Sequence, residues 1–245
     1  MFFIHRKTIK ILRVFSYALF LLTTIDAANA YTENNEVENH ERWYQVEMII
    51  FSRNNSNSDE AWPKDIKLSY PNNLISLKTS SNDFEGINVL DSNERKLNAL
   101  AATLIKNGNY TLLFHQAWRQ MIYGRKTNIL INGGKTFNGH QELEGSISLS
   151  VAQYLKLQTN LWLTQFSPLG ELKTDSITAD AWPELPSLHA PSESDKTNDA
   201  LVTRIVKINQ QRSMRSVEVH YIDHPLLGII IKIIPSDQPI IKTNK

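Results

Sequence analysis

The chain of 245 residues contains no cysteine. This absence excludes disulfides, thiolate chemistry and a lipid-modified N-terminal cysteine. The chain also lacks an excess of either charge, because its formal net charge at pH 7 is only +1. Nucleic acids and anionic membranes are bound by clustered Lys and Arg, so we expect this nearly neutral chain to bind neither.

No apolar run near the N-terminus is long enough to span a bilayer. The run at 14–25 covers about twelve residues, whereas a transmembrane helix needs about 20. Four Lys and Arg precede it, and Ala28-Asn29-Ala30 follows with small residues where signal peptidase requires them. We therefore expect a signal peptide at 1–30, cleaved after Ala30, and an exported protein of a bacterial cell envelope that has no transmembrane segment after cleavage. The signal peptide holds four of the 26 Lys and Arg and one of the 25 Asp and Glu, so the remainder has a net charge of about −2.

The sequence contains no P-loop, nucleophile elbow or dinucleotide-binding motif, because the glycines at 133–134 and 139 lack the required strand, helix and lysine context. We expect no cofactor. A glycan hydrolase would need two carboxylates, and Glu47, Glu142 and Glu144 lie on predicted strands. Glu142 and Glu144 would share a strand face, about 7 Å apart. Solvated strand faces commonly carry such pairs, so the sequence favours a protein that is not an enzyme.

Alternation of apolar and polar residues predicts a series of strands along the chain. The predicted strands are 43–51, 110–118, 127–131, 135–138, 143–151, 155–163, 201–209 with a continuation at 214–222, and 227–234. Asn132-Gly133-Gly134 predicts a hairpin turn, and Asp223-His224-Pro225 predicts the turn that joins the last two strands.

Apolar residues at helical spacing predict one main helix over residues 91–107. Its apolar positions are Leu97, Leu100, Ala101, Leu104 and Ile105, with Ser92 as the cap and Asn107-Gly108 as the stop.

The order of these elements predicts an α+β fold, in which a largely antiparallel sheet carries this helix on one face. We expect a single domain over residues 43–235, a disordered leader at 31–42 and a flexible tail at 236–245. Two polar stretches, 52–90 and 167–199, are predicted to be long surface loops, and long loops often carry function.

A first candidate binding surface consists of His115, Trp118, Arg119 and Gln120. An aromatic face packs on sugar rings, and Arg and Gln can hydrogen-bond the carboxylates and amides of peptide stems. Trp118 shares strand parity with core residues, so core packing and ligand contact both remain open. Arg119 points to the opposite face of a regular strand.

A second candidate group consists of His220, Asp223 and His224. Two imidazoles and a carboxylate within five residues could hold zinc. However, the spacing is wrong for a helix, and Asp-His-Pro is typical of a tight turn in which the Asp accepts backbone N–H groups. We therefore expect no metal and keep the three residues as candidate ligand-binding groups.

Four blocks of the sequence together resemble the CsiV family of envelope proteins. The blocks are Tyr44-Gln-Val-Glu-Met-Ile-Ile-Phe51, Leu113-Phe-His-Gln-Ala-Trp-Arg-Gln120, the stretch Leu143-Glu-Gly-Ser-Ile-Ser-Leu149 that leads to Tyr154-Leu155 and Leu161-Trp-Leu163, and His220-Tyr-Ile-Asp-His-Pro-Leu-Leu-Gly228. The family is described as peptidoglycan-binding and is connected with cell shape and cell-wall synthesis.

The resemblance implies a non-catalytic periplasmic factor that binds peptidoglycan and supports wall synthesis, with a penicillin-binding protein or its lipoprotein activator as a further partner. Two alternatives remain open. One is a protein–protein adaptor for a wall-synthesis complex without direct affinity for glycan, and the other is a cell-wall hydrolase or amidase.

Overall fold

The computed structural model describes residues 42–54, 63–77, 86–168, 182–188 and 200–237, which all belong to one compact unit spanning residues 40–245. The expected signal peptide, nearly all of the leader, most of the tail and parts of both long loops lie outside the described residues. Within the described ranges, no helix has the length and hydropathy that a membrane crossing requires.

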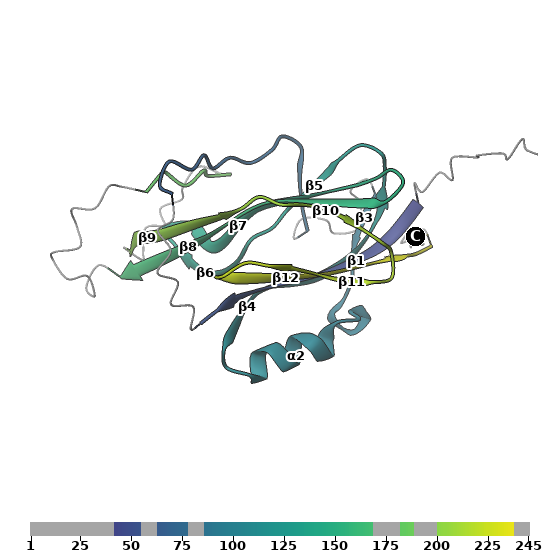
Figure 1. Ribbon diagram of the computed structural model, residues 1–245, viewed down its shortest axis with the longest axis horizontal. Coiled ribbons are helices and arrows are strands. Elements are labelled where there is room, and N and C mark those ends of the chain that lie inside the picture. The colour runs from purple at the N-terminus through teal and green to yellow at the C-terminus, as the bar shows by residue number, and fades with distance from the viewer. Residues whose placement is uncertain (1–41, 55–62, 78–85, 169–181, 189–199, 238–245) are drawn as a thin grey trace, which may run out of the picture. The chain divides into compact units, whose positions relative to one another are not determined.

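Five strands form the first sheet, in the order β11-β12-β1-β4-β3 (Figure 1). They are β1 (Arg42–Arg53), β3 (Ile87–Val89), β4 (Tyr110–Ile122), β11 (Val219–Asp223) and β12 (Leu227–Pro235), and every neighbouring pair is antiparallel. The long strand β1 lies at the centre because both of its neighbours pair with it over most of its length.

The second sheet runs β10-β8-β7-β5-β2 and also contains β6 and β9. Its strands are β2 (Leu74–Ser76), β5 (Thr127–Leu130), β6 (Gly133–Phe137), β7 (His140–Val151), β8 (Leu155–Pro168), β9 (Ala200–Ile208) and β10 (Gln211–Met214). The long strands β7 and β8 each pair with two shorter strands, one along each half: β6 and β5 on β7, and β9 and β10 on β8.

The core lies between the two sheets, which form separate layers in Figure 1. Val46, Met48 and Ile50 alternate along β1 and belong to the same buried cluster as Ile147 and Leu149 of β7. Period-2 alternation therefore gives each sheet one apolar face, and the two apolar faces pack on each other, which is the arrangement of a β-sandwich.

The predicted α+β class is wrong, because the described chain is mostly β. It forms twelve strands in two sheets, one α-helix of nine residues, α2 (Asn98–Lys106), and a 3-10 turn, η1 (Ser92–Glu94). Alternation identifies the strands and their apolar faces but does not assign them to one sheet or two. The sequence therefore predicted one sheet with a helix where the structure has a two-layer sandwich.

The predicted helix at 91–107 is interrupted at its start. Arg95 has an extended backbone with φ −69° and ψ 135°, so η1 ends there and α2 begins three residues later. Leu97 and Ala101 are buried as predicted, whereas Leu100 and Ile105 are exposed. The helix therefore buries a narrower stripe than its apolar spacing predicted.

The hairpin predicted at Asn132-Gly133-Gly134 does not form between β5 and β6. Both strands pair instead with β7, β5 along its second half and β6 along its first half. The tight turn lies at Asn138-Gly139, where both residues have positive φ and connect β6 to β7. The turn predicted at Asp223-His224-Pro225 does join β11 to β12.

Replacing Trp118 tests the interior of the sandwich. The side chain is fully buried, so we expect Trp118→Ala to lower the free energy of unfolding by about 3–5 kcal/mol in urea titrations. Tyr154→Ala is the matched control, because this tyrosine is exposed and its loss should change stability by less than about 0.5 kcal/mol. Equal stability of the two variants would contradict a core position for Trp118.

Candidate functional site

The helical segment, residues 92–106 with η1 and α2, covers part of the outer face of the five-stranded sheet. Leu97 and Ala101 of this segment pack on Ile49 and Phe51 of β1, and Ile230 of β12 belongs to the same cluster. Strand β11 lies at the edge of the sheet, beyond β12, and several of its outward side chains are exposed. Among the described residues, the strip along β11 is therefore an accessible part of this face.

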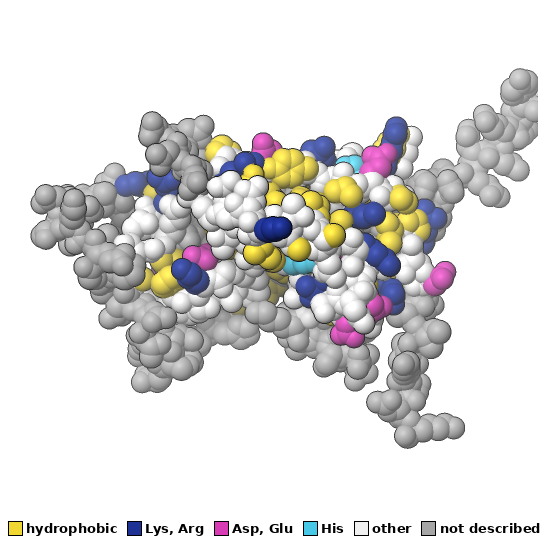
Figure 2. Space-filling model, turned by 90° about the horizontal axis from the view of Figure 1, so that it is seen from below, with side chains coloured by type: hydrophobic (Ala, Val, Ile, Leu, Met, Phe, Trp, Pro, Cys, Tyr) yellow, Lys and Arg dark blue, Asp and Glu magenta, His cyan; other side chains and the backbone are white. Residues whose placement is uncertain are grey.

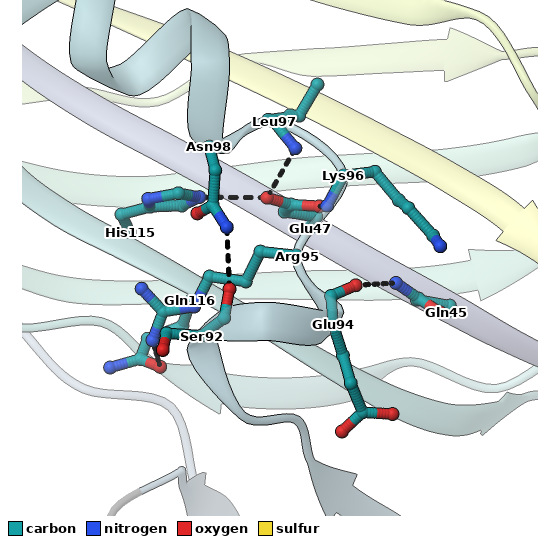
Figure 3. A network of polar contacts seen from close by, with 10 residues as sticks. All are labelled: Gln45, Glu47, Ser92, Glu94, Arg95, Lys96, Leu97, Asn98, His115 and Gln116. Carbon is teal, nitrogen blue, oxygen red and sulfur yellow. Dashed lines mark hydrogen bonds and ion pairs between the residues drawn. The ribbon is translucent and has the colours of Figure 1, made fainter.

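Beneath the helical segment, Glu47 of β1 holds the start of α2 in place (Figure 3). Its carboxylate accepts hydrogen bonds from the backbone N–H groups of Lys96 and of Leu97, the latter at 2.9 Å, and from His115 Nε2 at 2.8 Å. The first N–H groups of a helix have no partner within the helix. Leu97 is the N-cap residue of α2 and Lys96 precedes it, so the carboxylate of Glu47 binds the chain to β1 where it enters the helix.

These contacts also change the acidity of Glu47. Burial alone would raise its pKa, but the hydrogen bonds from His115, Leu97 and Lys96 outweigh burial and lower the pKa below its ordinary value. Glu47 is therefore ionised at neutral pH, and as a carboxylate it only accepts hydrogen bonds, so the proton in its contact with His115 is on Nε2.

Two of the candidate residues on β4 hold the helical segment. His115 binds Glu47, and its side chain is 7% exposed. Arg119 pairs with Glu94 of η1 at 3.3 Å through a side chain that is 30% exposed. Both lie on the outer face of the sheet, and Arg119 keeps some surface that a ligand could reach.

The other two candidates on β4 point inward. Trp118 and Gln120 are both 0% exposed, and Trp118 Nε1 donates to Gln120 Oε1 at 2.6 Å. They share the parity of the core residues, whereas His115 and Arg119 have the opposite parity. The four residues therefore do not form one surface, and Trp118 and Gln120 present no area to a ligand in this structure.

An open pocket of about 300 Å³ lies at the β11–β12 turn and is lined by Arg53, Asp223, His224 and Pro225. Arg53 Nη2 pairs with Asp223 Oδ1 and donates to the Tyr221 hydroxyl at 2.7 Å, while Arg53 Nε donates to the His224 carbonyl at 3.3 Å. The Tyr221 hydroxyl donates in turn to Asp223 Oδ1 at 2.8 Å. Arg53 and Asp223 of the pocket wall therefore form a triad with the neighbouring Tyr221.

The triad determines the protonation of its members. The hydrogen bond from Tyr221 and the pairing with Arg53 hold the pKa of Asp223 below its ordinary value. Burial and the hydrogen bond to Asp223 raise the pKa of Tyr221 to about 12. At neutral pH the site therefore consists of an ionised carboxylate, a protonated phenol and a guanidinium.

Apolar side chains continue from this pocket along β11. Val219 and Tyr221 lie on the outer face, two residues apart, and are 51% and 41% exposed. Val217, just before the strand, is 60% exposed and has φ +74°, a backbone conformation that β-branched residues rarely adopt. Figure 2 views the side of the molecule on which α2 lies and shows hydrophobic side chains gathered in a band with Lys and Arg among them. We call Val217, Val219 and Tyr221 the β11 strip.

His220 is separated from the pocket by strand geometry. It has the opposite parity to Tyr221 and Asp223, and its Nε2 lies 3.0 Å from the Arg215 carbonyl. In the part of the chain that the structure describes, no group of three His, Asp or Glu side chains is placed to hold a metal ion. Of the second candidate group, Asp223 and His224 line the pocket and His220 does not.

Besides Glu47, the carboxylates considered for hydrolysis are Glu142 and Glu144, and each of these two accepts a hydrogen bond from a backbone N–H group. Glu144 is buried on the outer face of the second sheet and accepts from Gln141 N at 3.2 Å, with Trp162 Nε1 and His140 Nδ1 each at 3.3 Å. Glu142 accepts from Lys135 N at 3.0 Å. Glu144 therefore joins the start of its own strand β7 to Trp162 of the neighbouring strand β8.

Sequence reasoning missed Arg53 and Tyr221. The sequence analysis placed Arg53 in the predicted loop at 52–90, whereas in the structure Arg53 is the last residue of β1. Tyr221 lies between His220 and Asp223, and the strand parity that separates His220 from the site places Tyr221 beside Asp223. Parity along 219–223 was therefore the signal that could have identified Tyr221.

The protein is thus a two-sheet β-sandwich. It has an open pocket with polar lining residues at the β11 edge of the first sheet. Residues 16–236 match the family model described as "Peptidoglycan-binding protein, CsiV". The chain belongs to the CsiV family, as its four sequence blocks predicted. Searches of the curated proteins and of the solved structures found no match.

Changing Glu47 tests how strongly it holds the chain at the start of α2. Glu47→Gln removes the charge that three donors share, so we expect the free energy of unfolding to fall by about 2 kcal/mol at pH 7. Because folding lowers the pKa of Glu47, its contribution is present at neutral pH and is lost as the pH falls through the folded-state pKa. The gap between wild type and variant should therefore narrow below about pH 4.

Urea unfolding at pH 7 and at pH 3 measures both effects. Glu142→Gln is the control, because that carboxylate accepts from Lys135 N at an exposed position and should contribute less. A Glu47→Gln variant as stable as wild type at pH 7, or a gap that is equally wide at pH 3, would contradict the role assigned to Glu47.

Proposed function

We propose that this protein is a non-catalytic, periplasmic peptidoglycan-binding factor that supports cell-wall synthesis and cell shape. The observation that carries the proposal is the family match over residues 16–236. The signal peptide expected at 1–30 agrees with it, because peptidoglycan lies outside the inner membrane and a binding protein must be exported to reach it.

The pocket at Asp223 and His224 is the binding site that we propose. An exposed tyrosine ring beside planar polar groups suits a polymer of sugars and short peptides, since the ring packs on apolar faces while the polar groups fix orientation. His115 and Arg119 stand on the same sheet face, and of these Arg119 keeps exposed surface. We therefore treat Arg119 as the second position to test.

A protein–protein adaptor is the second candidate function. The observation that favours it is the pair of exposed valines in the β11 strip, Val217 and Val219, because exposed apolar side chains on an edge strand suit a protein partner. In that case the partner would be a penicillin-binding protein or its lipoprotein activator, and the protein would have no affinity of its own for the wall.

Sedimentation with purified sacculi separates the two candidates. We expect wild-type protein to pellet with sacculi that contain no other protein. Tyr221→Ala and Asp223→Asn should each leave most of the protein in the supernatant, because the first removes the ring and the second breaks the triad. Arg119→Ala tests the region next to the helical segment.

Tyr154→Ala is the matched control, since Tyr154 is about as exposed as Tyr221 but lies at the β7–β8 turn of the other sheet. Circular dichroism of every variant verifies that it folds. If folded wild type stays in the supernatant, direct wall binding is wrong, and a pull-down from envelope extract would then test the adaptor.

A further inference from the structure

The charges of the pocket cancel within the protein. Arg53 supplies the positive charge, and Asp223 pairs with it directly while the Tyr221 hydroxyl bridges the two. Asp223 lies directly beside the guanidinium, so a ligand carboxylate that approached Arg53 would be repelled by the carboxylate of Asp223. The site is therefore poorly suited to an anion.

The same arrangement suits a neutral donor. The side chain of Asp223 is 65% exposed, and a carboxylate has about four lone-pair positions, so it can accept further hydrogen bonds from a ligand. Sugar hydroxyls and acetamido N–H groups are donors of this kind. Charge-assisted hydrogen bonds to a carboxylate are stronger than neutral ones and do not require a charged ligand.

The ring of Tyr221 is held in place before any ligand arrives. Its hydroxyl is bound by Arg53 on one side and Asp223 on the other, so the ring has little freedom to lose on binding. A fixed, partly exposed aromatic ring can stack on the C–H face of a pyranose. Val219 lies about 7 Å farther along the same face and extends the apolar surface beyond a single ring.

We propose that the triad of Arg53, Tyr221 and Asp223, with Val219 beside it, binds the glycan strand of peptidoglycan through hydroxyl and N-acetyl groups and does not bind the carboxylates of the peptide stems. This inference rests on the proposed function and adds the part of the polymer that is recognised. An open pocket suits such a ligand, because an extended chain can lie along a sheet edge without being enclosed.

The test compares glycan strands before and after an amidase has removed their peptide stems, both immobilised on a sensor surface. Wild-type protein should bind the two polymers with Kd values that agree within about threefold, since stem carboxylates make no contact and surface charges interact weakly in salt. Tyr221→Ala should raise Kd about tenfold for both polymers, which is the typical effect of removing one stacked aromatic group. Tyr154→Ala should leave both Kd values unchanged.

Salt provides a second readout. Recognition of neutral groups predicts that Kd for intact strands changes less than about twofold between 0.05 and 0.5 M NaCl, whereas carboxylate recognition would weaken strongly. Binding that is lost with the stems, or an undiminished affinity of folded Tyr221→Ala for stem-free strands, would overturn the inference while the proposed function stands. Failure of wild type to bind intact strands would overturn both.

Discussion

The register of β12 between β1 and β11 is the constraint on which the candidate site depends. Gly228 pairs with Phe51 on one side and with Asp223 on the other, so the ends of β1 and β11 meet across β12 and Arg53 reaches Asp223. A side chain at position 228 would collide with the Phe51 ring, since an added Cβ would lie 2.3 Å from it. A slip of one residue would turn Tyr221 and Asp223 to the inner face of the sheet.

The position of the helix leaves this edge accessible. Glu47 fixes the start of α2 over β1, and the apolar stripe of the helix covers the centre of the sheet but not β11. The outer face of the first sheet therefore has two parts. The helix covers one part and stabilises the fold there, and the other part exposes Val219, Tyr221 and Asp223 of β11. Because no described element packs over β11, its exposed apolar side chains are available to a ligand.

Local patterns predicted the strands well and the long-range contacts poorly. Alternation found nearly every long strand, and the parity of Trp118 with core residues already favoured its burial. The shortened helix could not be predicted, because Glu47, far away in the sequence, competes for the N–H groups of Lys96 and Leu97. Sheet membership and the pocket likewise depend on which strands become neighbours, so Arg53 was assigned to a loop although it lies beside Asp223.

Amide hydrogen exchange with and without soluble glycan strands tests the central claim most directly, because it locates the contact without any substitution. The account predicts slower exchange at residues 219–224 and at the end of β1 when glycan is present, with unchanged exchange along the buried centre of β4. Protection confined to the second sheet, with no change at 219–224, would contradict it and would place the glycan on a different surface of the sandwich.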